Sequence, residues 1–285
     1  MGNWLILLDL DGTITDFAGR IAGSTVRAIQ QAKANGHVVV LCTGRASAEI
    51  PRGIWDLGFD GAITAGGARV ELAGAELATE PIPNELLSEL VQHCFGANSA
   101  YCLYSEDDLH PGPQMRQRFG AIAERLLAGG LPSAGHDAIQ VSPREHPLLR
   151  RTEFTNWRAA GPIVKGLFLN DAPEALTEFR EAFAGRLHVT AASVPGLGAG
   201  SGEFTRAGID KGTSVQLLLN QLGIEHTRSL GIGDSFNDLA LLRACGVGVA
   251  MGSAEAALRA IADHVTDGVL DNGIWNALSQ LGLIE

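Results

Sequence analysis

Two carboxylates stand at the end of the most apolar stretch near the start of the chain. The run Trp4–Leu8 is followed at once by Asp9 and, two residues later, by Asp11, in the order LLDLDGTIT. An apolar run of this length indicates a fully buried strand. Paired carboxylates at a strand end suit nucleophilic or metal-binding chemistry, but Asp-Gly is also a common turn pair. The pair alone leaves both alternatives open.

Further polar residues follow two other apolar runs and a turn. They are Thr43, Gly44 and Arg45 after HVVVLC, Lys211 in GIDKG, and Asp234, Asn237 and Asp238 after SLGIG. Each one alone is compatible with a helix cap, a turn or a solvated surface group. Parallel strands, however, bring their carboxyl ends to one edge of a sheet, where ligands bind. The joint occurrence therefore favours a single site at that edge.

The predicted site carries more negative charge than its own residues neutralise. Four carboxylates and one lysine at one edge require compensation, and a divalent cation supplies it. A ligand set of oxygen atoms, without His or Cys, favours Mg²⁺ over zinc. A zinc site at His93, Cys94, Cys102 and His110 fits no standard spacing and is not expected. We predict Mg²⁺ as the cofactor.

The elements that must position these residues alternate between two periods. WLILL, HVVVLCTG and DGAITAGG indicate strands, GSTVRAIQQAKANG a helix, and RASAEIPRGIWDLG helical structure broken near Pro51. The alternation returns after residue 210 with the strands RSLGIGD and GVGVAM and the helices DKGTSVQLLLNQLG and SFNDLALLRAC. Strand–helix–strand order predicts right-handed crossovers. The expected fold class is α/β, with a doubly wound parallel sheet.

The middle of the chain has a different character. EPIPN at residues 80–84 indicates a linker, and AYCLYS, PIVKGLFLN and RLHVTAAS indicate strands among helices such as PEALTEFREAFAG. We expect a core domain from residues 1–81 and 205–285, with an inserted α+β domain at 82–204. GLGAGSG is not expected to bind a dinucleotide, because Ser201 stands where the third glycine belongs.

Composition limits the partners and the location. The chain has 285 residues, 46% of them hydrophobic, and a net charge of −11, which suits a globular protein that binds neither nucleic acid nor anionic membranes. Its four cysteines form no C-x-x-C pair, which is typical of reduced thiols. The first apolar run is too short for a signal peptide or a membrane span. We expect a cytoplasmic protein; its oligomeric state is not predicted.

Four segments resemble the motifs of the haloacid dehalogenase-like (HAD) hydrolases: DLDGTIT, CTGR, GIDKG and GDSFNDLALL. The segments FDGAITAGGARV, GVGVAMGSA and DHVTDGVLDNGIWNAL resemble the Cof-type branch in order and spacing. The insert between the second and third motifs matches the large cap domain of that branch. The chain departs from the branch at residues 65–67, where Ala-Gly-Gly replaces the common Asn-Gly. The resemblance implies a Rossmann-like core with an inserted cap.

The resemblance also implies a Mg²⁺-dependent phosphatase. Asp9 would be the nucleophile that becomes an aspartyl phosphate, and Asp11 would protonate the leaving alcohol and then activate water. Because its neighbours are anionic, we expect Asp11 to hold a proton more readily than a free aspartate. The other implied roles are phosphate binding by Thr43, Gly44 and Lys211, metal binding by Asp9, by Asp11 through its main chain and by Asp234, and support from Asn237 and Asp238.

The expected substrate is a small phosphorylated metabolite such as a sugar phosphate. A phosphomutase or phosphotransferase that uses the same intermediate is the alternative. A catalytically silent phosphoryl-binding module would lack at least one site residue, and none is missing. Specificity should reside in the insert, where four polar residues are candidates: Arg151, Asn156, Lys165 and Asn170.

Overall fold

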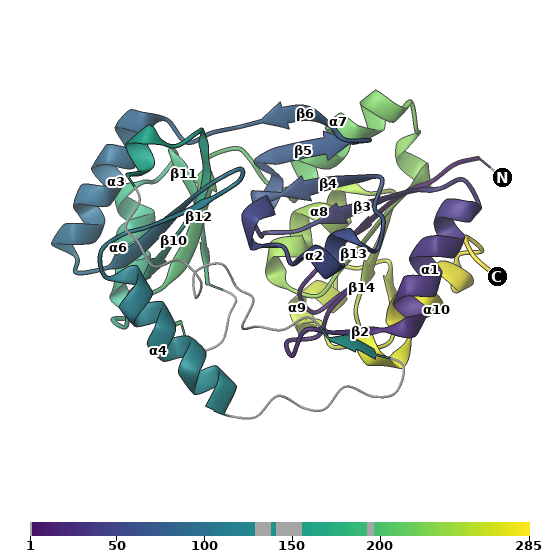
Figure 1. Ribbon diagram of the computed structural model, residues 1–285. Helices are drawn as coiled ribbons and strands as arrows, with labels where there is room; N and C mark the ends of the chain where they lie inside the picture. Colours follow the sequence, from purple (N-terminus) through teal and green to yellow (C-terminus); the bar gives the residue numbers. More distant parts are fainter. Residues whose placement is uncertain (1, 129–137, 141–155, 193–196) are drawn as a thin grey trace.

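The computed structural model describes residues 2–128, 138–140, 156–192 and 197–285. Two sheets stand side by side in two domains, with the larger sheet at the right of Figure 1 and the smaller at the left. The larger sheet has eight strands in the order β15-β14-β13-β1-β3-β4-β5-β6, and the smaller has five in the order β11-β12-β10-β7-β8. The chain is thus an α/β core with a separate α+β insert, as predicted.

The larger sheet is parallel at its centre. Its strands are β1 (Leu5–Leu8), β3 (Val38–Cys42), β4 (Gly61–Thr64), β5 (Arg69–Leu72), β6 (Ala75–Thr79), β13 (Ser229–Gly233), β14 (Val247–Ala250) and β15 (His264–Val265). Strands β15, β14, β13, β1, β3 and β4 pair in parallel, whereas β5 and β6 pair antiparallel. All four residues of β1 are fully buried, because the strand is central and covered on both faces.

Helices cover both faces of this sheet. They are α1 (Gly23–Ala34), α2 (Arg52–Trp55), α7 (Lys211–Leu222), α8 (Leu239–Ala244), α9 (Ala256–Arg259) and α10 (Gly273–Gln280). Helix α1 packs against α10, and α7 packs against α8. Right-handed crossovers from the central β1 and β13 in opposite directions put these two pairs on opposite faces (Figure 1). The predicted doubly wound topology is confirmed.

The hairpin β5–β6 was not expected from the sequence. It extends the edge of the sheet next to β4 and turns at Ala73 and Gly74, whose φ values are 51° and 77°. Positive φ at both central residues is typical of the two-residue hairpin turn that matches strand twist. The glycine in LAGAEL was the available signal for this turn.

The second domain is antiparallel. Its elements are α3 (Asn84–Gly96), β7 (Ala100–Ser105), β8 (Leu109–Pro111), α4 (Met115–Ala128), β10 (Ile163–Leu169), α6 (Glu174–Ala182), β11 (Leu187–Ala191) and β12 (Gly202–Arg206). One face of its sheet packs an aromatic cluster in which the rings of Phe168 and Phe179 stack with centroids 4.1 Å apart. Strand β12 reaches Arg206, so the predicted boundary at residue 204 falls inside this strand.

Two short strands connect the insert to the core. Strand β9 (Ala138–Gln140) pairs antiparallel with β2 (Arg20–Ala22), which directly precedes α1. Strand β9 therefore belongs to the insert in sequence and to the core in its pairing. Among the described helices, none is both long and apolar enough to cross a membrane.

Candidate active site

The candidate site lies at an edge formed by three neighbouring parallel strands. In the register of the sheet, Leu8 at the end of β1 lies beside Ile232 of β13 on one side and Leu41 of β3 on the other. The residues that follow these strands therefore meet at one edge. Asp9, Thr43 and Asp234 are the first polar residues there, and all three are buried.

Lys211 is the central cation of this edge. It begins α7, which is capped by Asp210, whose side chain accepts a hydrogen bond from the amide of Thr213. The Lys211 ammonium group lies 2.6 Å from Asp9 Oδ1 and 2.5 Å from Asp238 Oδ1. Burial alone would lower the pKa of Lys211, but the carboxylates of Asp238 and Asp9 raise it far above its ordinary value. Lys211 is therefore a permanent positive charge within the site.

Asp238 uses both carboxylate oxygens inside the protein. While Oδ1 binds Lys211, Oδ2 accepts hydrogen bonds from the amides of Asp234 and Ser235 at 3.0 and 3.1 Å. This fully buried side chain fixes the turn that carries Asp234 and also fixes the lysine. The supporting role that the sequence analysis gave to Asp238 stays a prediction.

The remaining acidic oxygens fit a divalent cation. Oxygens of Asp9, Asp234 and Asp238 lie within 4.8 Å of one another, and Asp234 Oδ1 is buried without a hydrogen-bond partner among the described residues. Burial, followed by the charge of Asp238, raises the pKa of Asp234 to about 7. Burial and Asp238 also raise the pKa of Asp9, against the opposing effect of Lys211. An oxygen-only set with surplus negative charge suits a hard cation such as Mg²⁺.

Asp11 does not behave as the sequence analysis expected. Its carboxylate forms a two-pronged ion pair with Arg45, with Nε–Oδ2 at 2.8 Å and Nη2–Oδ1 at 2.6 Å. Burial acts to raise the pKa of Asp11, but Arg45, through its charge and hydrogen bonds, and the charges of Lys211 and Lys165 together outweigh it, and the pKa is lowered. The expectation of a raised proton affinity was wrong, because the nearest charge is a guanidinium group. The side chain of Asp11 also lies outside the acidic cluster, and its expected main-chain metal contact stays a prediction.

Three predicted residues line the edge around this centre. Thr43 is buried, and its hydroxyl accepts a hydrogen bond from the amide of Arg45 at 3.1 Å. A side chain at Gly44 would stand 3.7 Å from Asn237 Nδ2, so these two residues are neighbours. Asn237 is exposed, and its Oδ1 accepts a hydrogen bond from Ser235 Oγ at 2.8 Å. The structure thus brings the second and fourth motifs together.

Of the four specificity candidates in the insert, one lies at the core. Lys165 on β10 is 3.1 Å from Glu203 and 3.4 Å from Glu49 of the core domain. Asn170 instead binds Ala97 and Ser99 within the insert. Asn156 caps a short 3₁₀ turn, where its side chain accepts a hydrogen bond from the amide of Arg158. The fourth candidate, Arg151, lies outside the described residues.

Arg45 and Glu49 had no assigned role in the sequence analysis, although Arg45 was recognised at the strand end. The signal was the arginine of CTGR, placed two residues after Thr43. Glu49 lies in no recognised motif, and only its position between the two domains indicates a role.

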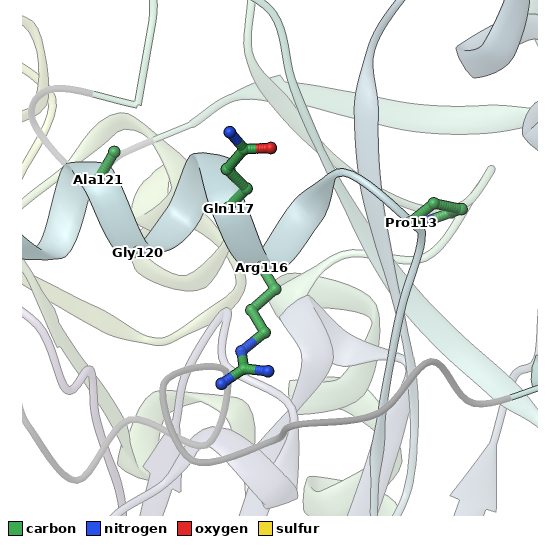
Figure 2. Close-up of a pocket in the computed structure, with 5 residues that line it drawn as sticks. All are labelled: Pro113, Arg116, Gln117, Gly120 and Ala121. Atoms are coloured by element: carbon green, nitrogen blue, oxygen red, sulfur yellow. The ribbon is translucent and has the colours of Figure 1, made fainter.

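A shallow depression on α4 is a separate feature (Figure 2). It is lined by Pro113, Arg116, Gln117, Gly120 and Ala121, none of which belongs to the candidate site.

Comparison with known proteins gives the class of this fold and site. The family model of the haloacid dehalogenase-like hydrolases matches residues 6–278, so the chain belongs to that family. Phosphatase YwpJ of Bacillus subtilis is 25% identical over 97% of this chain and 99% of its own length. A phosphoglycolate phosphatase of Methanopyrus kandleri is 25% identical over 97% of this chain and 96% of its own.

Solved structures agree in fold. A HAD phosphatase from Bacteroides thetaiotaomicron superposes with a TM-score of 0.77 at 23% identity, covering 99% of this chain and 96% of that one. A HAD subclass IIB sugar phosphatase gives 0.74 at 22% identity, covering 99% and 100%. At these identities the structures establish the fold alone. With the family match and the full-length relatives, the chain is a phosphoric monoester hydrolase of the HAD type.

Proposed function

We propose that the protein is a Mg²⁺-dependent phosphatase that hydrolyses small phosphate monoesters, such as sugar phosphates, through an aspartyl-phosphate intermediate. The observation that carries the proposal is the arrangement around Lys211. Its ammonium group lies 2.6 Å from Asp9, beside a carboxylate oxygen of Asp234 that has no hydrogen-bond partner in the described part of the chain. A dianionic phosphate repels an attacking carboxylate unless nearby cations offset the negative charges of the two groups. Lys211 supplies one cation, and Asp9 and Asp234, with the main chain of Asp11, would hold the other.

In the first half-reaction, Asp9 attacks phosphorus and the ester oxygen leaves. Lys211 and the Thr43–Gly44 segment bind the transferring oxygens, and Asp11 gives a proton to the leaving alcohol. Mg²⁺, when bound, acts as a Lewis acid that offsets the negative charge of the phosphoryl group. Arg45 favours the ionised form of Asp11 in the free protein. An arriving phosphate dianion instead favours the protonated form of Asp11, which can give its proton to the leaving alcohol.

In the second half-reaction, Asp11 accepts a proton from the water that attacks the aspartyl phosphate. Inorganic phosphate leaves and the Asp9 carboxylate is restored. The Arg45 ion pair suits this step, because it keeps Asp11 ionised and oriented. Splitting one difficult displacement into two easier ones is the advantage of covalent catalysis.

The domain arrangement and the named relatives both support a small phosphorylated substrate. We propose that residues 82–206, which end with β12, form a cap that closes over the site and admits small substrates, and that the segments on either side of it form the core. One structural neighbour is named a sugar phosphatase, and one relative a phosphoglycolate phosphatase. The reduced-thiol composition supports a cytoplasmic location.

The test is a metabolite panel assayed for phosphate release with Mg²⁺ and with EDTA. We expect hydrolysis of one or more small monoesters, with kcat/KM values ranking the substrates, and no activity in EDTA. Asp9→Asn should abolish turnover while the fold survives, whereas Asp107→Asn, at an exposed position of the second domain, should not. Full activity of Asp9→Asn would refute the nucleophile. Phosphoryl transfer to a second sugar in place of water would identify the mutase alternative.

A further inference from the structure

A short loop of the core is seated in the insert. It runs from Arg45 to Glu49, includes a 3₁₀ turn at Ser47–Glu49, and directly follows the phosphate-binding residues of the second motif. Ala46 is 1% exposed and packs in an apolar cluster of the insert that contains Tyr104 and Leu167. A core residue is thus buried by the other domain, so the loop position depends on how the domains dock.

The docked loop is also held by charge. Glu49 and Lys165 are both nearly buried, and Lys165 Nζ lies 3.4 Å from Glu49 Oε2 and 3.1 Å from Glu203 Oε2. The ammonium group also stands 5.4 Å from the centre of the Tyr104 ring. Buried charges of this kind are costly to separate, because each would be left without its partner. Lys165 and Glu49 therefore couple the two domains at one defined point.

A continuous series of contacts leads from this ion pair to the candidate site. Glu49 Oε2 accepts a hydrogen bond from the amide of Ala46 at 2.9 Å, and the carbonyl of Glu49 accepts one from Arg45 Nη1 at 3.3 Å. The other two guanidinium nitrogens of Arg45 bind Asp11. The loop therefore closes on itself through Glu49 and holds the arginine that orients Asp11.

We propose that Glu49 and Lys165 are positioning residues, through which docking of the insert orients Arg45 and thereby Asp11 for attack of water on the aspartyl phosphate. The inference rests on the proposed function and goes beyond it, since neither residue is among those assigned to bind the phosphoryl group. In the step concerned, a water oxygen bonds to phosphorus, the bond from phosphorus to Asp9 breaks with its electron pair on the Asp9 carboxylate, and the water proton passes to Asp11.

The experiment separates the two half-reactions with 2,4-dinitrophenyl phosphate, whose leaving group needs no proton. Rapid mixing with Mg²⁺ measures the first release of dinitrophenolate and then the steady rate, and acid quenching traps the phosphorylated enzyme. In Glu49→Gln we expect dinitrophenolate to be released in the first turnover at the wild-type rate. The steady rate should be about 10-fold lower, because misorientation of Asp11 removes part of the rate enhancement that a general base supplies. Phosphoenzyme should accumulate, and kcat and KM should fall together.

Glu203→Gln is the matched control. It removes the other carboxylate from the same lysine with the same change in charge, but Glu203 binds Lys165 from β12 of the insert and is not part of the Arg45–Glu49 loop. In this variant the ratio of the first-turnover rate to the steady rate should equal that of the wild type. Lys165→Met should resemble Glu49→Gln, and Lys165→Arg should restore the steady rate. If Lys165→Met does not fold, the comparison of the two glutamine variants still decides the question.

The outcomes distinguish this inference from the proposed function. If the wild type hydrolyses the ester but Glu49→Gln slows both half-reactions equally, slows neither, or matches Glu203→Gln, then Glu49 has only a structural role and the inference is overturned. If the wild type forms no phosphoenzyme, the proposed function fails and the inference fails with it. Selective loss of the second half-reaction in Glu49→Gln, with rescue in Lys165→Arg, supports it.

Discussion

At the scale of single residues, the acidic edge consists of carboxylates with different partners. Asp238 uses its oxygens on Lys211 and on two amides, and Asp11 uses its own on Arg45. Asp234 has a buried oxygen with no hydrogen-bond partner among the described residues, and Asp9 has its second oxygen available beyond the lysine contact. The candidate metal site is therefore distinguished by which oxygens lack a hydrogen-bond partner among the described residues, a distinction that residue types alone could not give.

Gly12 is the residue whose size matters most at this edge. Its φ is +84°, and a side-chain carbon there would lie 2.1 Å from Asp234 Oδ2. We expect Gly12→Ala to displace Asp234 and to lower kcat by about 100-fold or more, since a small misplacement at a reacting centre has that effect. Gly74→Ala is the control, because it has a similar φ of +77° but no neighbour within 4 Å. Equal activity in the two variants would contradict this view of Gly12.

Asp234→Asn tests the metal assignment without an activity assay. Removing one carboxylate from a buried acidic cluster should raise the Tm of the metal-free protein, because like charges repel. Added Mg²⁺ should raise the Tm of the wild type, since a ligand that binds only the folded state stabilises it. This Mg²⁺-dependent rise should disappear in Asp234→Asn and persist in Asp56→Asn, whose side chain is exposed in the core. An unchanged Mg²⁺ effect in Asp234→Asn would place the ion elsewhere.

At the scale of elements, the sequence predicted what periodicity and turn residues encode. The strands β1, β3, β4, β13 and β14 and the helices α1, α7 and α8 all lie within the predicted segments. The hairpin β5–β6 was missed because its strands are short, lie at the edge and are only partly buried, so they lack a strong alternating pattern. The Arg45–Glu49 loop was not predicted as a unit, because the residues that hold it come from the other domain. Lys165 pairs with Glu49, and apolar residues of the insert surround Ala46.

His37 joins the start of β1 to the end of the chain. Its Nδ1 accepts a hydrogen bond from the amide of Trp4, and its Nε2 lies 3.2 Å from the carbonyl of Leu283. Burial lowers the pKa of His37 below 6.5, although the hydrogen bond to the Leu283 carbonyl acts in the opposite direction. The folded state therefore favours the neutral ring, which alone can accept the Trp4 hydrogen bond.

The resulting pH dependence has a definite sign. Because the pKa of His37 is lower in the folded than in the unfolded state, its contribution is complete above pH 6.5 and is lost as the pH falls through the folded value. We expect the free energy of unfolding to decrease in this range in urea titrations, and to decrease less in His37→Gln. His188→Gln, at an exposed position on β11, should follow the wild type. An identical pH profile in His37→Gln would contradict the assignment.

At the scale of the whole molecule, specific contacts join the two domains at several places. Arg69 of β5 forms an ion pair with Glu106 at the end of β7, and Lys165 pairs with Glu49. Strand β9 pairs with β2 at a third place. Small apolar contacts accompany them at Ala46 and between Ala65, Ala68 and Val164, and small interfaces between domains permit relative motion. Docking of the insert can thus respond to substrate while each domain keeps its own core.

Ala46 allows docking to be weakened without unfolding either domain. Its methyl group is buried against the insert, in the cluster that includes Leu109 and Leu167. Extra carbon atoms in a well-packed contact destabilise it by about 1–3 kcal/mol. In Ala46→Leu this strain is relieved when the domains separate, so the substitution weakens docking and not the fold of either domain. Each 1.36 kcal/mol corresponds to a tenfold rate change, so kcat/KM for the best sugar phosphate should fall about 10-fold or more, while Tm changes little. Ala182→Leu, exposed on α6, should alter neither quantity. A large loss of Tm with unchanged kcat/KM would show that Ala46 belongs to the folding core and not to a contact that opens and closes.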